Sequence, residues 1–262
     1  MKKGFITLVV GLITLSGFSQ EKEKSGTLKV ANTKITVTSS DSAAVGIVKE
    51  DSTKQFINGH IEFGVNGYLS NNNTIALNKG DELMELNYGR SRYFAYYMMF
   101  DGMNIVKDKM FFLTGLGLSY NGYFFENNVN IGTANDTTLF TQDTLINYDK
   151  YKLRATYLQI PVMVRFRFHE PDEKGLNMTL GVIGGYRIGS KIKAKYTLDG
   201  DKKKDKIKDD FNFSPFKADA TLRIGYSSFG LAFNYSLTSL FEKGKAPELY
   251  PFSIGITLGG GF

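Results

Sequence analysis

The sequence predicts an all-β protein: an eight-stranded, antiparallel, up-and-down transmembrane β-barrel of the outer-membrane type. Three observations predict this class. Eight segments alternate apolar and polar residues with a period of two, their connections alternate between long and short, and aromatic residues bracket the segments at two levels. The mean hydropathy of −0.20 is compatible with a barrel, because strands that alternate between a lipid face and a polar face are unremarkable on average.

The N-terminal segment has the composition of an export signal. Two lysines precede an apolar stretch at residues 5–18, which is too short to span a bilayer as a helix. Gly17 and Ser19 supply small residues at the −3 and −1 positions of a cleavage after Ser19. We therefore expect residues 1–19 to be a signal peptide and the mature protein to reside in the outer membrane.

The composition argues against several other classes of protein. The chain contains no Cys, so a lipoprotein anchor and disulfide bonds are excluded. A net charge of +6 would suit a nucleic-acid partner, but an exported chain without a nucleic-acid-binding motif argues against one. Residues 20–57 are rich in Ser, Thr and Lys, which indicates a partly disordered periplasmic linker with room for one loose strand. The barrel is then expected over residues 58–262.

The eight predicted strands share an alternation with a period of two. They cover residues 60–70, 90–100, 110–125, 151–168, 176–197, 211–226, 229–240 and 250–262. In the seventh, Phe229, Leu231 and Phe233 share one face, and Gly230 and Asn234 lie on the other. This period excludes helices, in which apolar residues recur every 3.6 residues.

The connections predict the orientation of the barrel. Long connections at 71–89, 126–150, 198–210 and 241–249 alternate with short ones at 101–109, 169–175 and 227–228. Barrels of the outer membrane have short periplasmic turns and longer extracellular loops. We therefore expect the long connections to face outside.

The stretch YLQIPVMVRFRF at 157–168 determines which face meets lipid. Its even positions are apolar, whereas Arg165 and Arg167 fall on the odd face. A basic side chain facing lipid at the bilayer midplane costs roughly 2–4 kcal/mol. The apolar ridge must therefore face outward, and the charged residues must line the interior.

A polar network is predicted inside the barrel, since eight strands leave room for side chains and little more. Its expected members are Glu62, Gln159, Arg165, Arg167, Arg187, Lys217, Asp219 and Arg223. The first interpretation is a structural plug, in which Arg187 pairs with Asp219 across the fifth and sixth strands. The alternative is an anion site, because five basic groups face only two acids.

The ends of the strands carry further signals. Lys191, Lys193 and Lys195 continue the inward phase of the fifth strand, as a charged hairpin or as a basic rim that contacts lipopolysaccharide phosphates or an acidic partner. An outer aromatic belt is expected at Tyr120, Tyr123, Tyr151, Tyr186, Phe213, Tyr250 and Phe252. Phe262 ends the last strand in register, which is typical of the signal that the outer-membrane insertion machinery recognises.

Several of these segments resemble a known family. The YLQIP segment at 157–161, the strand GVIGGYRIG, the strand FGLAFNYSLTSL and the C-terminal Phe together resemble the outer-membrane β-barrel domain of Bacteroidota, the PorT-like group. The resemblance covers about residues 58–262. It implies the fold and the location, but it implies little about activity.

Catalysis is not expected. The two histidines, His60 and His169, both fall at the periplasmic end, away from the outer rim where an outer-membrane hydrolase or acyltransferase would need a base. The acidic residues at 199–210 are interleaved with Lys and lack the order of a calcium loop, so no metal and no cofactor are expected.

The sequence thus predicts a non-enzymatic protein with a structural, surface-binding or secretion-accessory role. Its expected partners are outer-membrane lipid, lipopolysaccharide, the insertion machinery and an unknown protein at the extracellular loops. A narrow pore, a lipid-modifying enzyme and a soluble periplasmic binding barrel remain as alternatives.

Overall fold

The computed structural model describes residues 26–30, 33–37, 46–48, 57–100, 104–106, 108–170 and 173–259. The chain divides into two units, Met1–Lys54 and Gln55–Phe262. In the first unit, where the sequence indicated room for one strand, three short strands form an antiparallel sheet in the order β1-β2-β3. They are β1 (Gly26–Val30), β2 (Thr33–Val37) and β3 (Gly46–Val48). The predicted signal peptide lies outside the described residues.

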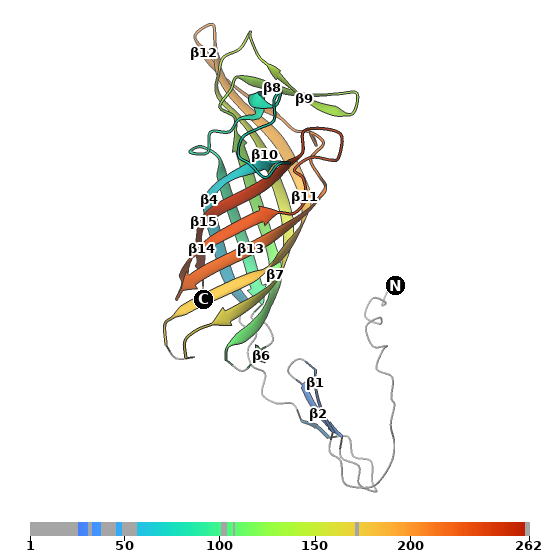
Figure 1. The fold of residues 1–262 in the computed structure, drawn as a ribbon, viewed down its shortest axis with the longest axis vertical. Coiled ribbons are helices and arrows are strands. Elements are labelled where there is room, and N and C mark those ends of the chain that lie inside the picture. The colour runs from blue at the N-terminus through green and yellow to red at the C-terminus, as the bar shows by residue number, and fades with distance from the viewer. Residues whose placement is uncertain are drawn as a thin grey trace. The chain divides into compact units, whose positions relative to one another are not determined.

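The second unit is a closed ring of eight antiparallel strands (Figure 1). They are β4 (Ile57–Ser70), β5 (Arg92–Phe100), β7 (Met110–Phe124), β10 (Tyr148–Arg167), β11 (Leu176–Leu198), β13 (Phe216–Tyr226), β14 (Phe229–Ser236) and β15 (Leu249–Gly259). Each strand pairs with the next one of the eight, and the pairing of β15 with β4 closes the ring. The predicted fold class is confirmed.

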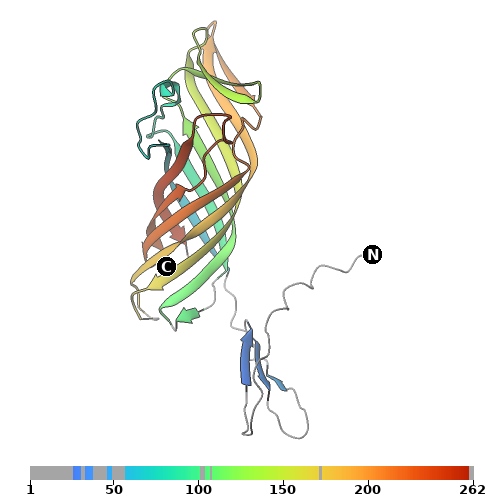
Figure 2. The same cartoon turned by 45° about the vertical axis from the view of Figure 1, so that its right-hand side comes forward.

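Smaller elements decorate the two ends of the ring. The additional elements are β6 (Asn104–Val106), β8 (Val129–Ala134), β9 (Thr137–Gln142), β12 (Asp201–Ile207) and the 3-10 helix η1 (Glu82–Met84). Strand β12 pairs with the extension of β11, and β8 pairs with β9, beyond the ring at its end with the long loops (Figure 1, Figure 2). We call this end the outer end. No helix of the described residues is long and apolar enough to cross a membrane.

The two faces of the strands have the predicted phase. On β10, the outward residues Leu158, Ile160 and Val162 are 43%, 53% and 49% exposed, whereas Gln159 is buried. Similar outward ridges of exposed apolar residues occur on β4, β5, β7, β11, β13, β14 and β15. The ring therefore presents an apolar surface to its surroundings and a polar surface to its interior.

A β-bulge in β11 reverses the phase of the residues that follow it. Thr156 pairs with Gly189, but the next residue of β10 pairs with Arg187, so β11 contains an extra residue at Ile188. One extra residue turns every later side chain to the opposite face. Beyond the bulge, Ile192, Ala194 and Tyr196 are buried. The prediction that Lys191, Lys193 and Lys195 face inward was therefore wrong: they lie on the outward face.

Two predicted strands are shorter than expected, because their ends belong to a buried cluster. Strand β13 begins at Phe216 rather than at residue 211, and β14 ends at Ser236 rather than at residue 240. Phe211, Phe213 and Leu240 are instead almost completely buried in an apolar cluster at the outer end. Alternation alone could not separate a lipid-facing residue from one in this cluster.

The same cluster corrects the outer aromatic belt. Tyr123, Tyr151 and Phe213 were expected near lipid, but they are 1%, 4% and 0% exposed within the cluster. Tyr186 does lie on the outward face, 51% exposed, with its ring centroid 5.4 Å from that of Phe216. Of the expected belt, Tyr186 therefore lies on the outward face, whereas Tyr123, Tyr151 and Phe213 belong to the internal cluster.

The orientation of the ring leads to a labelling prediction. Leu145 is 91% exposed in a long connection, and Lys203 lies on the exposed β12, whereas Ser228 is exposed in a short turn. Because the chain has no native Cys, we expect single cysteines at Leu145 and Lys203 to react with an impermeant thiol reagent in intact cells. A cysteine at Ser228 should react only after the outer membrane is permeabilised. Labelling in the opposite pattern would contradict the assignment.

Candidate functional site

The centre of the barrel interior is a buried ion pair between β4 and β13. Arg223 Nε lies 2.7 Å from Glu62 Oε1, and the two side chains are 2% and 1% exposed. Their strands are separated in the ring by β14 and β15, so the pair spans the interior. Because both charges are removed from solvent, each depends on the other for compensation.

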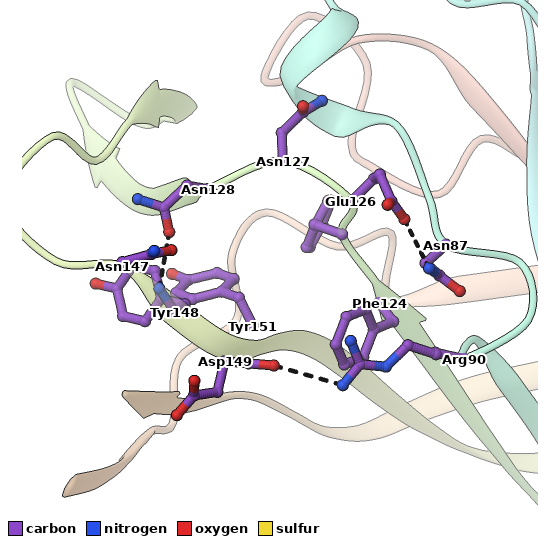
Figure 3. A pocket seen from close by; sticks show the side chains of 11 residues that line it. Asn87, Arg90, Phe124, Glu126, Asn127, Asn128, Asn147, Tyr148, Asp149 and Tyr151 are labelled. Atoms are coloured by element: carbon purple, nitrogen blue, oxygen red, sulfur yellow. Dashed lines mark hydrogen bonds between the residues drawn. The ribbon is translucent and has the colours of Figure 1, made fainter. Parts of the chain in front are cut away.

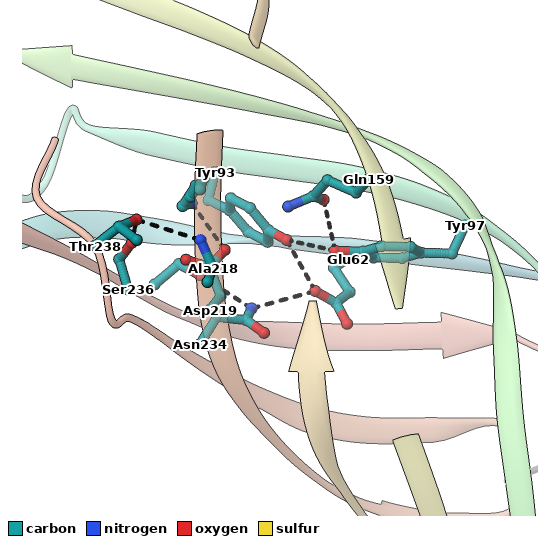
Figure 4. Close-up of polar contacts among 11 residues, drawn as sticks. Glu62, Tyr93, Tyr97, Gln159, Ala218, Asp219, Asn234, Ser236 and Thr238 are labelled. Carbon is teal, nitrogen blue, oxygen red and sulfur yellow. Dashed lines mark hydrogen bonds and ion pairs between the residues drawn. The ribbon is translucent and has the colours of Figure 1, made fainter. Parts of the chain in front are cut away.

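Hydrogen bonds extend this pair across the barrel (Figure 4). Tyr93 donates to Glu62 Oε2 at 3.1 Å and contacts the hydroxyl of Tyr97 at 3.2 Å. Tyr97 in turn donates to Gln159 Oε1 at 2.9 Å. On the other side, Asn234 donates to Glu62 Oε2 at 3.4 Å. The network therefore connects β4, β5, β10, β13 and β14, and it acts as an internal brace.

The structure brings together some of the predicted interior residues and separates others. Glu62, Gln159 and Arg223 belong to the brace, and Lys217 with Asp219 forms a second ion pair of 2.9 Å. The predicted pair of Arg187 with Asp219 was wrong, because Tyr186 is opposite Phe216 and the next residue therefore lies beyond the start of β13. Arg187 donates to Ser190 Oγ at 3.2 Å.

The cause of this misplacement is the turn that follows β11. Pairing Arg187 with Asp219 requires a turn midway between the two residues, but the chain reverses earlier, at Asp199 and Gly200, both with positive φ. An Asp-Gly pair suits the two-residue hairpin turn that needs this conformation. Strand β12 then pairs back on β11, which shifts the register of β13.

The remaining two basic residues lie in the part of β10 near its short-turn end. Arg165 is 5% exposed, and the guanidinium of Arg167 lies 4.5 Å from the centroid of the Phe111 ring. Phe262, the predicted assembly signal, lies outside the described residues, so its role stays a prediction.

Sequence reasoning missed the tyrosines and asparagine of the brace. Tyr93, Tyr97 and Asn234 fall on inward positions of strands that were correctly predicted. A buried tyrosine hydroxyl normally needs a polar partner. The available signal was the presence of tyrosines on the same inward face as charged residues, which are suitable hydrogen-bond partners for their hydroxyl groups.

Close approach of neighbouring groups requires glycine at interior positions. A Cβ atom added to Gly117 would lie 2.3 Å from Cδ1 of Tyr97, so the absence of a side chain there makes room for the tyrosine ring of the brace. A Cβ atom added to Gly64 would lie 2.2 Å from the carbonyl oxygen of Ile254. Glycine therefore permits both the packed interior and the seam between β4 and β15.

At the outer end of the barrel, three connections are bound to one another. Thr138 of the β8–β9 hairpin donates its backbone N–H to Lys245 O at 2.8 Å and its hydroxyl to Phe211 O at 2.9 Å. Lys245 also forms a 3.0 Å ion pair with Asp136. Beneath these bonds, the stacked rings of Phe213 and Phe241 lie 5.2 Å apart. We call this assembly the outer cap.

A small polar pocket opens beside the outer cap (Figure 3). Its volume is about 110 Å³, and its walls come from the connections around Asn87, Asn128 and Tyr148. Asn87 donates to Glu126 Oε2 at 2.7 Å, and Arg90 lies with its guanidinium 3.7 Å from the centroid of the Phe124 ring. The pocket is large enough for a few polar atoms.

The two histidines lie away from the outer end of the barrel. His60 is 1% exposed on β4. His169 lies in a short turn, where Nδ1 is 2.8 Å from Glu170 O and Nε2 is 3.3 Å from Asn177 Nδ2. Neither lies at the outer cap or at the polar pocket.

An apolar outward face, a braced polar interior and a closed ring of eight strands define a small membrane β-barrel. The model of the outer membrane protein beta-barrel domain matches residues 39–242, and the chain therefore belongs to this family. The protein is thus an outer-membrane β-barrel protein, as the sequence predicted.

Other comparisons are more distant. No curated protein sequence matches the chain. Among solved structures, the crystal structure of Ail, the attachment invasion locus protein of Yersinia pestis, is similar with a TM-score of 0.27 and 12% identity. The match covers 78% of this chain and 98% of that one.

Proposed function

We propose that this protein is a non-enzymatic outer-membrane protein of the PorT-like group of Bacteroidota, with a braced interior and an outer surface that binds other molecules. Its role would be structural, surface-binding or secretion-accessory. The observation that carries this proposal is the outer cap. Three connections far apart in the sequence are joined there by hydrogen bonds above a buried aromatic cluster.

The closed interior supports a binding role in preference to a pore. Glu62 and Arg223 occupy the centre of the barrel, and Phe213 and Phe241 lie across its outer end. Loops that are ordered in this way form a defined surface, and loops on a rigid scaffold are a common place for binding residues.

Exposed apolar residues on the outer connections support a protein partner. Ile75, Leu139 and Leu145 are 59%, 46% and 91% exposed. Single apolar residues on a surface are common, but these three lie on connections that carry many hydrogen bonds. We propose the outer cap and these residues as the region that contacts an unknown protein partner.

Single-channel recording tests the proposed closed barrel. We expect the purified protein to insert into planar bilayers without producing discrete conductance steps, because the brace and the outer cap obstruct the interior. A large open porin, inserted under the same conditions, serves as the positive control. Reproducible steps from the unmodified protein, with the insertion verified by protease protection, would instead support the narrow pore.

A further inference from the structure

A group of basic side chains covers the outward face of the barrel directly beyond the bulge in β11. We call it the basic ribbon and define it by Arg154 and the largely buried Lys152 (6% exposed) of β10, Lys191 and Lys193 of β11, Lys206 of β12, and Lys208 directly after that strand. The sequence had placed its β11 lysines inside the barrel. The bulge at Ile188 instead turns them toward the surroundings.

The strand register places like charges directly opposite each other in the basic ribbon. Arg154 is paired with Lys191, and Lys193 lies between Lys152 on one side and Lys206 on the other. Like charges opposite each other destabilise a sheet. None of the four ion pairs among the described residues involves these side chains. The protein therefore maintains repulsion that a bound anion would relieve.

Burial and the repulsion between these charges lower the pKa values of two lysines of the basic ribbon. Burial, followed by repulsion from Lys206, Arg154 and Lys208, lowers the pKa of Lys191. The pKa of Lys193 is lowered mainly by Arg154 and secondarily by burial. An anion placed among these groups would stabilise their charged forms.

The basic ribbon begins where the lipid-facing ridge ends. The last outward apolar residues are Leu158 on β10 and Ile188 on β11, which are 43% and 54% exposed. At about 3.3 Å per residue, Lys191 lies roughly 10 Å farther along the strand than Ile188. Charges at this distance from the apolar band are at the level of the lipid headgroups, where phosphates are concentrated.

A cavity of about 310 Å³ lies at this boundary. Arg154, Lys191 and Lys208 line its basic part, and Ile188 lines its apolar part together with Gly189. Arg154 is held in place by Tyr120, since its guanidinium donates to the tyrosine hydroxyl and lies 5.0 Å from the ring centroid. The cavity therefore offers an oriented guanidinium and two ammonium groups beside an apolar surface.

We propose that the basic ribbon binds the phosphate groups of a phosphorylated glycolipid in the outer leaflet, with the acyl chains on the apolar ridge below. An amphipathic ligand fits this site because its charged and apolar parts match adjacent parts of one surface. The inference deepens the proposed function and rests on its outer-membrane orientation. It names a lipid, whereas the outer cap is proposed to contact a protein.

Binding to the unmodified full chain in a neutral detergent tests the proposal. Three probes are compared: bisphosphorylated lipid A, dephosphorylated lipid A, and inorganic phosphate. Native mass spectrometry and a competition titration report bound lipid. We expect lipid A to bind and its dephosphorylated form to bind at least on the order of 10 times more weakly. Equal binding of the two lipids, or binding of inorganic phosphate as tight as that of lipid A, would overturn the glycolipid assignment.

A matched pair of variants locates the site. The triple variant Arg154→Gln, Lys191→Gln and Lys193→Gln should bind lipid A on the order of 100-fold more weakly, since each basic residue near anionic lipid contributes about a factor of five. The control removes three exposed charges elsewhere, with Lys109→Gln, Lys174→Gln and Lys243→Gln, and should bind as tightly as the unmodified chain. Equal losses in both variants would refute a specific site. Heat-modifiable gel mobility verifies that each variant is folded.

The pH dependence of binding provides a second readout. Burial lowers the pKa of Lys152 to about 8, assisted by repulsion from Arg154, Lys150, Arg92 and Lys193. Because a bound phosphate favours the protonated lysine, the affinity should fall as the pH rises above 8. Lys152→Arg keeps the charge and should flatten this part of the profile, whereas titration of the phosphate itself affects both proteins equally. An unchanged profile in the Arg variant would exclude Lys152 from the site.

The outcomes separate this inference from the proposed function. If cysteines at Leu145 and Lys203 label from outside but lipid A does not bind, only the glycolipid site is wrong. If these cysteines label from the periplasm, the orientation on which both proposals rest is wrong.

Discussion

Replacing Glu62 by Gln should lower the free energy of unfolding by about 3–5 kcal/mol, as expected when one partner of a buried ion pair is removed. The change keeps the size of the side chain and an oxygen that Tyr93 and Asn234 contact. It leaves the guanidinium of Arg223, 2% exposed, without its counter-charge. Urea titration of the protein in lipid vesicles measures the loss.

An exposed ion pair provides the matched control. Glu242 lies 2.9 Å from Lys245, with the two side chains about one-third exposed. Because an exposed pair contributes about 0–1 kcal/mol, Glu242→Gln should change the free energy of unfolding by less than about 1 kcal/mol. In a double-mutant cycle, Glu62→Gln with Arg223→Met should destabilise less than the sum of the single changes. Additive effects would show that the two residues do not interact.

Gly64→Ala should have a comparably large effect, for a steric reason. The added methyl group would lie 2.2 Å from Ile254 O and 2.6 Å from Gly255 Cα, and both are backbone atoms. Backbone atoms cannot move aside as a flexible side chain does, so the cost should reach or exceed the roughly 1–3 kcal/mol typical of overpacking. Gly64 faces Gly255 in the pairing of β4 with β15. The substitution therefore strains the seam that closes the barrel.

Gly184→Ala is the control for this steric effect. Gly184 lies on the outward face of β11, where an added Cβ atom would come no closer than 3.9 Å to Ile160 O. We expect this variant to fold as well as the unmodified protein or slightly better, since alanine restricts the unfolded chain. The fraction with heat-modifiable mobility and the urea midpoint measure both variants. Equal behaviour of the two would mean that the seam has room for a methyl group.

Both predictions concern the interior, and the first of them distinguishes a structural brace from a binding site. If Glu62→Gln destabilises the barrel as expected, the polar residues of the brace are held there for stability. If Glu62→Gln and Arg223→Met leave stability unchanged but alter the binding of an anion, the anion-site interpretation of the five interior cations would be favoured instead.

The sequence by itself determined the class, the number of strands and the phase of most of them. This succeeded because lipid-facing strands obey a strict period of two, and because a charge facing lipid is costly. Gln159, Arg165 and Arg223 could therefore be assigned to the interior from alternation alone, and all three are buried. The alternation of connection lengths separated the two ends of the barrel in the same way.

Only the tertiary structure decided which interior residues meet and where the phase changes. The pairing of Glu62 with Arg223 depends on how β4 and β13 are placed across the closed ring, and local alternation contains no information on that distance. The bulge at Ile188 is likewise a property of the register between β10 and β11. A period of two predicts which face a residue occupies only while strand pairing continues without interruption. One inserted residue therefore turned Lys191 and Lys193 from the inward face to the outward face.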